Sequence, residues 1–185
     1  MNTPETNIAP MIVPLVVAAA LLIGCAGAET PVAAVSVPEP IKARAGESLA
    51  RVVPAKGVQI YECRAVKDKT GVWEWAFVAP DAELFDTRGN RIGKHYAGPK
   101  WEAADGSIVS ATVQGRADAP KSSDISRLLL NATASGPQGS FSKVTGIQRV
   151  NTVGGIAPSM PCGAANAGAQ ARVPYTADYY FLARG

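Results

Sequence analysis

The segment Gly93–Ser107, GKHYAGPKWEAADGS, combines residue types that are common in catalytic and ligand-binding sites. His95 is the only histidine of the chain, and Tyr96, Trp101 and Asp105 follow it closely. A histidine beside a carboxylate can transfer protons near neutral pH, whereas an aromatic ring offers a face on which a sugar or another flat ligand can stack. The segment therefore predicts a binding site or an active site, and the alternative is that the same residues pack as scaffold.

Further polar and aromatic residues stand near the C-terminus. In an extended segment, Tyr175, Tyr179 and Phe181 would share one face and Asp178 would lie on the other. A few convergent polar groups beside apolar walls are typical of small-ligand sites. The ligand-binding candidates are therefore His95, Tyr96, Trp101, Asp105, Arg149 and Asp178. The alternative is an enzyme in which His95 is the acid–base and Asp105 or Asp178 orients it.

Several classes of function lack their signatures in this sequence. A single histidine cannot form a multi-histidine metal site, and neither HxH nor HExxH spacing occurs. The chain has no GxSxG elbow, no Walker loop and no GxGxxG after a strand. Its 18 Lys and Arg are scattered among 15 Asp and Glu, unlike the basic stripe of a nucleic-acid-binding protein. We therefore expect no metal, no cofactor and no nucleic-acid partner.

The N-terminal segment predicts export. The apolar run IAPMIVPLVVAAALLIGC contains Pro10 and Pro14 and is too short for a comfortable membrane-spanning helix. Its end, LIGC, resembles the lipobox of bacterial lipoproteins, in which the cysteine is lipidated after the preceding residues are removed. We expect a signal peptide over 1–24 and a lipid anchor on Cys25. Because Ala26 is not the Asp associated with inner-membrane retention, we expect the outer membrane, facing the periplasm or the cell surface; a soluble periplasmic or secreted protein is the alternative.

Export determines how the other two cysteines are interpreted. If Cys25 carries lipid, Cys63 and Cys162 are an even pair in an oxidising compartment, where a disulfide is expected. In the chain-entropy model, a bond that closes a loop of about 100 residues contributes about 4.7 kcal/mol to stability. Residues 25–52, rich in Ala, Val and Pro, predict a flexible tether between the lipid and the folded domain.

From residue 53 onward the pattern is one of short strands separated by turn residues. GVQIYECR places Gln59, Tyr61 and Cys63 on one face, and Asp105-Gly106 supplies the positive φ angles of a tight primed hairpin turn. Only SSDISRLLLNATA has a helical pattern, and residues 125–131 within it could equally be a buried strand. We expect 53–185 to be a single all-β domain, an antiparallel β-sandwich or small barrel with at most one short helix.

Four segments carry a resemblance to a known family. GVQIYECR, HYAGPKWEAADGS, IQRVNTVGG and CGAANAGAQARVPYTADYYFL are similar to segments of uncharacterised exported proteins of bacteria and fungi, catalogued as a domain of unknown function. The resemblance runs from about Val53 to Leu182. The matching positions are Gly57, Gln59, Tyr61 and Cys63; His95, Tyr96, Gly98, Pro99, Trp101, Asp105, Gly106 and Ser107; and Arg149, Val150, Asn151, Thr152, Gly154 and Gly155. The matches at Cys63 and Cys162 agree with the expected disulfide, and the family implies no established activity.

Together these features favour a non-enzymatic binding or structural domain of the cell envelope. The expected partners are the membrane, through the lipid anchor, and a glycan or another small molecule of the envelope. The exported enzyme that uses His95 remains the alternative.

Overall fold

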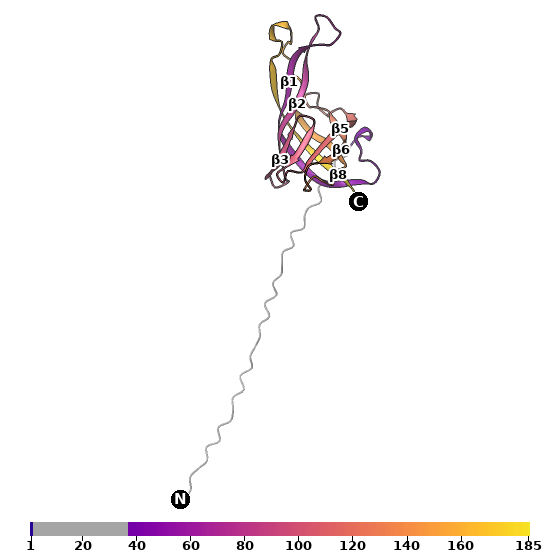
Figure 1. Cartoon of the computed structure of the whole chain (residues 1–185), viewed down its shortest axis with the longest axis vertical. Coiled ribbons are helices and arrows are strands. Elements are labelled where there is room, and N and C mark those ends of the chain that lie inside the picture. The colour runs from indigo at the N-terminus through magenta and orange to yellow at the C-terminus, as the bar shows by residue number, and fades with distance from the viewer. Residues whose placement is uncertain (2–36) are drawn as a thin grey trace. The chain divides into compact units, whose positions relative to one another are not determined.

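The computed structural model describes Met1 and residues 37–185, and within them eight antiparallel strands close into a barrel (Figure 1). Each strand pairs with the next along the chain, and β1 pairs with β8 to close the ring. The strands are β1 (Glu47–Ala65), β2 (Trp73–Phe85), β3 (Arg91–Tyr96), β4 (Lys100–Ala103), β5 (Ile108–Ala117), β6 (Arg127–Ser135), β7 (Gly146–Gly154) and β8 (Gln170–Arg184). The prediction of an all-β antiparallel fold is confirmed, in the form of a small barrel.

The described helical structure consists of two single turns of 3₁₀-helix, η1 (Glu39–Ile41) and η2 (Ala164–Asn166). The stretch 125–131, for which helix and strand were both open, enters strand β6 at Arg127. Leu128, Leu129 and Leu130 are all buried, so this strand lacks the inward–outward alternation that would have identified it. Within the described residues, no helix is long and apolar enough to cross a membrane.

The folded part of the chain begins before residue 53. Strand β1 starts at Glu47, where it pairs with Arg184, so 47–52 belong to the barrel instead of the tether. The Glu47 carboxylate is fully buried and accepts hydrogen bonds from Arg44 and from the Thr145 hydroxyl (2.7 Å). This network fixes the chain in front of β1 against the end of the barrel. The predicted signal peptide over 1–24, and Cys25, lie outside the described residues.

The barrel interior is packed at one end by large apolar side chains. Phe141 and Phe181 are both buried and meet edge to face, with their ring centroids 4.8 Å apart. The strands approach one another closely where a side chain is absent: a Cβ atom at Gly57 would lie 2.4 Å from the Cα atom of Ala82.

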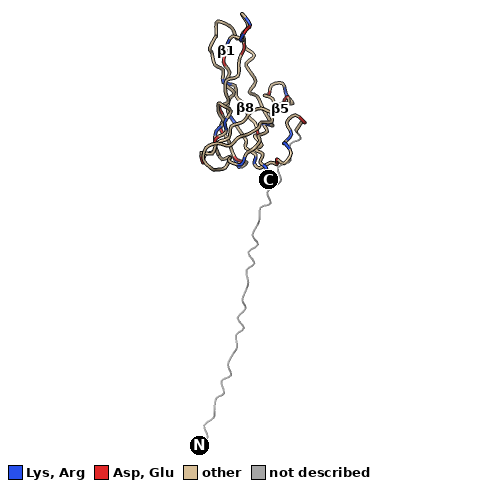
Figure 2. Tube along the Cα trace, turned by 45° about the vertical axis from the view of Figure 1, so that its right-hand side comes forward, with Lys and Arg blue, Asp and Glu red and all other residues tan. Residues whose placement is uncertain are grey.

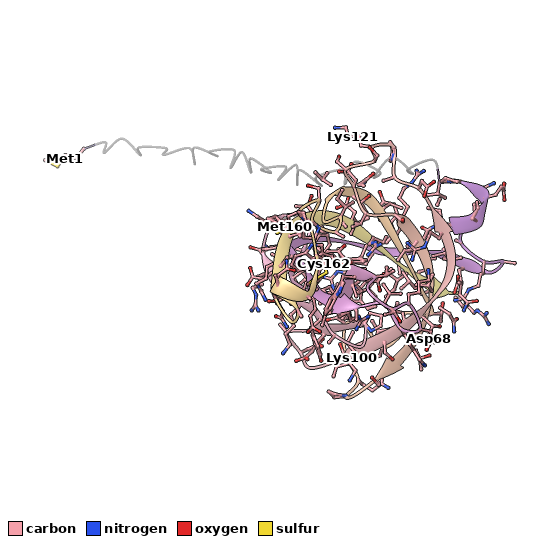
Figure 3. The ribbon with its side chains drawn as sticks, turned by 90° about the horizontal axis from the view of Figure 1, so that it is seen from above. Met1, Asp68, Lys100, Lys121, Met160 and Cys162 are labelled. Atoms are coloured by element: carbon pink, nitrogen blue, oxygen red, sulfur yellow. A yellow bond between two sulfur atoms is a disulfide. The ribbon has the colours of Figure 1, made fainter. Side chains whose placement is uncertain are left out.

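Seen from above, the strands form a ring (Figure 3). Positively and negatively charged residues are interspersed along the folded part of the chain (Figure 2).

The turn between β4 and β5 differs from the primed turn expected at Asp105-Gly106. Only Gly106 has a positive φ, of 83°, and its N–H donates to the Ala103 carbonyl. The Asp105 carboxylate instead accepts hydrogen bonds from the backbone and hydroxyl groups of Ser107 and Ser140, at 2.6–3.0 Å. These bonds hold the pKa of Asp105 well below its usual range. Asp105 therefore joins this turn to the segment before β7.

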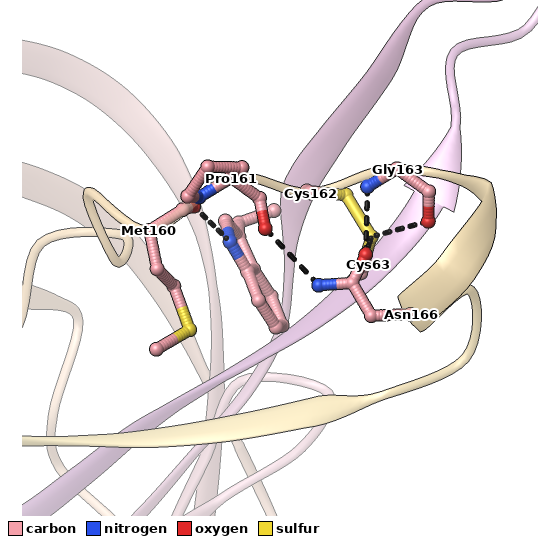
Figure 4. Close-up of a disulfide and its surroundings, with 7 residues drawn as sticks. Cys63, Met160, Pro161, Cys162, Gly163 and Asn166 are labelled. Atoms are coloured by element: carbon pink, nitrogen blue, oxygen red, sulfur yellow. Dashed lines mark hydrogen bonds between the residues drawn. A yellow bond between two sulfur atoms is a disulfide. The ribbon is translucent and has the colours of Figure 1, made fainter.

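The predicted disulfide between Cys63 and Cys162 is confirmed (Figure 4). It joins the end of β1 to the loop between β7 and β8, with the two Cα atoms 5.5 Å apart. Asn166 of η2 folds this loop locally, since its side-chain amide donates to the Pro161 carbonyl (3.0 Å) and its oxygen accepts from the Gly163 N–H (2.7 Å). The loop is thus attached to the barrel at its tip as well as at its ends.

Candidate ligand-binding cavity

A cavity of about 590 Å³ lies against the apolar core, which contributes Trp101, Leu128, Leu130 and Tyr179 to its lining. Its volume lies within the 300–1,000 Å³ typical of small-ligand sites. An eight-stranded barrel is wide enough to hold one small ligand when its interior is not filled by side chains. Residues from all eight strands and from loops between them line the cavity, among them Gln59, Tyr61, Phe77, Val78, His95, Trp101, Val113, Arg116, Asp124, Ile125, Ser126, Leu128, Leu130, Arg149, Ile156, Ala157 and Tyr179.

Three aromatic side chains form the inner wall of the cavity, where it meets the apolar core. His95 of β3 lies opposite Trp101 of β4, and their rings stack at 4.1 Å with an interplanar angle of 12°. Tyr179 of β8 meets both rings edge to face, at 5.1 Å and 5.2 Å. Trp101 and Tyr179 are each 1 % exposed and His95 is 3 % exposed. This aromatic wall is therefore rigid and shielded from water.

The hydrogen bond of His95 determines its tautomer. Its Nδ1 atom lies 2.9 Å from the Lys100 carbonyl oxygen. Because a carbonyl can only accept, Nδ1 carries the hydrogen and Nε2 carries the lone pair. Burial lowers the pKa of His95 from 6.5 to about 3. The imidazole is therefore neutral at neutral pH, and it adds no charge to the cavity.

This buried histidine predicts a specific dependence of stability on pH. Between pH 6.5 and 3 the unfolded chain binds a proton at His95 that the folded chain rejects, so stability falls as pH falls through this window. The loss at pH 5 is expected to be about 2 kcal/mol. His95 is the only histidine, and carboxyl groups titrate mainly below pH 5, so urea unfolding between pH 5 and 7 isolates its contribution. His95→Phe should make the curve flat in this range; a variant that keeps the wild-type slope would contradict the assignment.

Arg149 of β7 supplies the positive charge nearest the aromatic wall. It lies opposite Tyr179 in the β7–β8 ladder and opposite Leu128 in the β6–β7 ladder. Its Nε and Nη2 atoms both donate to the Ser126 carbonyl oxygen, at 3.1 Å and 2.8 Å. Burial raises the pKa of Tyr179, and the nearby Arg149 charge partly opposes that rise. Within residues 37–185, Arg149 forms no ion pair with a carboxylate.

Two hydrogen-bond donors of the cavity lining have no acceptor in the described part of the chain. They are the indole Nε1 of Trp101 and the amide Nε2 of Gln59, and both are shielded from solvent. Gln59 is only 2 % exposed. Buried polar groups are nearly always hydrogen-bonded in folded proteins, because an unpaired one costs about 1–3 kcal/mol. Trp101 Nε1 and Gln59 Nε2 are the two buried side-chain nitrogens for which the described residues supply no acceptor.

The segment between β5 and β6 covers one side of the cavity and is fixed to the end of β7. Asp124 pairs with Gly155, and its carboxylate accepts from the Gly154 N–H at 2.7 Å. Tyr61 of β1 donates to the Gly155 carbonyl at 2.7 Å. Gly155 has a φ of +82°, and a Cβ atom there would lie 2.8 Å from Cβ of Tyr175, so glycine is required at this junction.

The outer part of the lining is apolar and faces solvent. Phe77, Val78, Val113 and Ile156 all line the cavity, and each is more than two-fifths exposed. Large apolar side chains that gather at an opening mark the entry of an apolar ligand or a contact with a partner. The cavity therefore has an apolar entrance and a donor-rich interior.

Of the six predicted site residues, the structure brings three together at the cavity: His95, Trp101 and Arg149. The other three lie away from the lining. Tyr96 donates to Glu102 (2.8 Å), Asp105 fastens its turn, and Asp178 accepts from Asn151 (2.8 Å). Neither Asp105 nor Asp178 is hydrogen-bonded to His95, whose Nδ1–H donates to the Lys100 carbonyl oxygen.

The ligand-binding candidates did not include Gln59 and Tyr61, and Tyr179 was named only as part of an aromatic strand face. The sequence pattern places Gln59 and Tyr61 on the same face of one strand. Gln59 is polar on a face that otherwise suits the barrel interior, and this property could have identified it as a site residue. All four segments that carry the family resemblance meet here. They contribute Gln59 and Tyr61, then His95 and Trp101, then Arg149, and finally Tyr179.

The described residues contain no group of three or more His, Cys, Asp or Glu side chains placed to hold a metal ion. The cavity lining includes a single carboxylate, that of Asp124. The cavity lining offers hydrogen-bond donors, two guanidinium groups, this one carboxylate, one neutral imidazole and aromatic rings.

Comparison with known proteins identifies the chain at the level of a family. No curated protein and no solved structure matches it significantly. A family model described as "Protein of unknown function (DUF3455)" matches residues 44–183, a range that runs from just before β1 almost to the end of β8. The chain therefore belongs to the DUF3455 family of proteins of unknown function.

Proposed function

We propose that this protein is a lipoprotein of the cell envelope whose barrel binds a small molecule without transforming it. The observation that carries the proposal is the cavity in the barrel, whose interior holds buried hydrogen-bond donors without partners. Such donors are costly in an empty site and become satisfied when a ligand supplies acceptors. A purely structural barrel would gain stability by filling the same space with apolar side chains.

The environment of His95 supports binding over catalysis. A general acid–base needs a pKa near the working pH, whereas burial lowers the pKa of His95 to about 3. Its ring stacks on Trp101 and its Nδ1–H donates to a backbone carbonyl, which is how a packing histidine is held. No carboxylate in the described residues orients it for proton transfer.

Two features support a location in the cell envelope. The sequence LIGC, which ends at Cys25, matches the pattern at which bacterial lipoproteins are lipidated. The disulfide between Cys63 and Cys162 fits an oxidising compartment such as the periplasm. Two or more acyl chains on Cys25 would give stable attachment, and we infer the outer membrane as the site.

Ligand binding is tested by a thermal-shift screen of the purified full chain against fatty acids, aromatic acids, alcohols and glycans. A compound present at 100 times its dissociation constant should stabilise the protein by about 2.7 kcal/mol. Mass spectrometry of the recovered compound should show it unchanged. A conversion of the compound by the protein would instead establish the enzyme alternative.

A matched pair of variants links any stabilisation to the cavity. Val113→Trp places a large ring at the exposed entrance and should abolish the ligand-induced shift. Val153→Trp makes the same change at an exposed position outside the lining and should leave the shift intact. If no compound stabilises the wild type, or if Val113→Trp leaves every shift intact, the barrel interior is not the binding site.

A further inference from the structure

We propose that the ligand carries a single carboxylate on an otherwise apolar body, and that Arg149, Trp101 and Gln59 bind this carboxylate inside the barrel. The inference rests on the proposed function, because it specifies the chemistry of the molecule that the cavity holds. It follows from the charges, the unpartnered donors and the apolar lining of the same cavity.

The guanidinium of Arg149 is the first part of the carboxylate site. Two of its N–H groups share one acceptor, the Ser126 carbonyl oxygen, and the guanidinium also lies beside the Tyr179 hydroxyl. Both partners are neutral, so the charge of Arg149 can still pair with an anionic ligand. A guanidinium in a partly enclosed cavity is stabilised by an anion, and its planar fork matches a carboxylate. Among residues 37–185 no carboxylate plays that role for Arg149.

The two unpartnered donors extend the same site. An indole N–H can only donate, and Trp101 Nε1 has no acceptor among the described residues, so in the proposed site the ligand supplies one. The Gln59 side chain lies beside the Tyr175 hydroxyl, but its amide nitrogen forms no hydrogen bond of good geometry within the described residues, so it too can donate to the ligand. A carboxylate offers two oxygens with about four acceptor positions, enough for three donors. A ligand hydroxyl offers fewer acceptor positions than a carboxylate, and it carries no negative charge to pair with Arg149.

The charges of the lining favour one negative charge on the ligand. Arg149 and Arg116 are positive, Asp124 is negative and His95 is neutral, which leaves one net positive charge. Arg116 donates to the Ser126 hydroxyl (3.1 Å), and Asp124 accepts from Ser123 and Gly154. The Asp124 carboxylate repels anions, and it would repel a doubly charged group such as phosphate more strongly than a monoanion.

The rest of the ligand faces apolar side chains. Ile125, Leu128 and Leu130 line the interior, and Phe77 and Ile156 line the entrance. A glycan would place many hydroxyl groups against these surfaces without partners, which costs free energy for each group. An aliphatic or aromatic body instead gains from leaving water. The two sources of this chemistry are a fatty acid and an aromatic acid.

Calorimetric titration of the full chain at pH 7 with two matched pairs tests the carboxylate. Decanoate is compared with decan-1-ol, and 2-naphthoate with 2-naphthol, with inorganic phosphate as a further anion. At least one carboxylate should bind, and it should bind at least tenfold more tightly than its neutral partner. The stronger of the two acids indicates whether the natural ligand is aliphatic or aromatic, and phosphate should not bind.

Three variants assign the effect to the proposed residues. Arg149→Met should weaken binding of the carboxylate at least tenfold while changing binding of the matched alcohol little, a difference that a merely structural role would not produce. Arg91→Met, at an exposed arginine paired with Glu83 on the outside, is the control and should leave both affinities unchanged. Gln59→Met should weaken carboxylate binding yet raise the melting temperature of the unliganded protein, because it removes a buried amide without a partner.

The outcomes separate the two proposals. Equal affinity for acid and alcohol, or an equal loss of both in Arg149→Met, would overturn the carboxylate site and leave the proposed binding function standing. If only glycans bind, the carboxylate site is likewise overturned and the proposed binding function stands. The absence of any binding, together with an unaltered melting temperature in the wider screen, would overturn the binding function itself.

Discussion

Trp101→Ala is expected to lower the free energy of unfolding by about 3–5 kcal/mol, the range for truncation of a fully buried large aromatic side chain. Trp101 is 1 % exposed and packs against His95 and Tyr179, so its removal opens a hole between the apolar core and the cavity. Urea unfolding followed by circular dichroism measures the change. A domain of this size has only about 5–15 kcal/mol of stability, so the variant should be close to unfolding at 37 °C.

Trp73→Ala is the matched control, because Trp73 is only partly buried at the start of β2. It should cost much less than Trp101→Ala, and a comparable loss in both variants would contradict the central position of Trp101. Since Trp101→Ala perturbs folding, a binding role for Trp101 is better tested with Trp101→Phe. That variant keeps a ring against His95 and removes only the indole N–H donor.

Loss of the disulfide should have the second large effect. Replacing Cys63 and Cys162 by serine is expected to lower the free energy of unfolding by about 2–5 kcal/mol, because the bond joins residues 99 positions apart and constrains the unfolded chain. The same loop carries Ile156 and Ala157, which line the cavity, so ligand affinity should fall as well. Chemical unfolding with and without dithiothreitol measures the effect on stability.

The double serine variant also provides the internal control for the disulfide. Reductant should destabilise the wild type to the level of the variant and should leave the variant itself unchanged. If wild type and variant unfold at the same urea concentration under oxidising conditions, the Cys63–Cys162 bond does not stabilise the fold.

The strand pattern predicted the all-β class and left a sandwich and a closed small barrel as the two alternatives. Alternation such as that of Gln59, Tyr61 and Cys63 fixes which side chains face inward, and a sandwich and a barrel share that alternation. Closure depends on the ladder between β1 and β8, in which Val53 pairs with Tyr179 far along the chain. Such a pairing leaves no local signal. The run Leu128–Leu130 was ambiguous for a related reason, since burial of every residue hides the period of a strand.

Three of the six candidate residues line the cavity, and the position of each of the other three has a simple cause. His95, Trp101 and Arg149 reached the cavity because each lies on an inward-facing position of its strand. Tyr96 follows His95 directly, and successive residues of a strand point to opposite faces, so it lies outside the lining. Asp178 precedes Tyr179 and is excluded from the lining in the same way. Asp105 drew attention as a carboxylate, and the structure uses it to fasten a turn.

The Trp101 indole N–H tests the central claim most directly, because its resonance in a proton–nitrogen correlation spectrum reports whether an acceptor enters the cavity. On titration with decanoate or 2-naphthoate, whichever binds more tightly, the Trp101 signal should move downfield as its unpartnered N–H gains a charged acceptor. The signal of Trp75 should move little, because its Nε1 already donates to the Met160 carbonyl at 3.0 Å. Trp101→Phe assigns the resonance by removing it. A Trp101 signal that stays in place at saturating carboxylate would contradict ligand binding at this site.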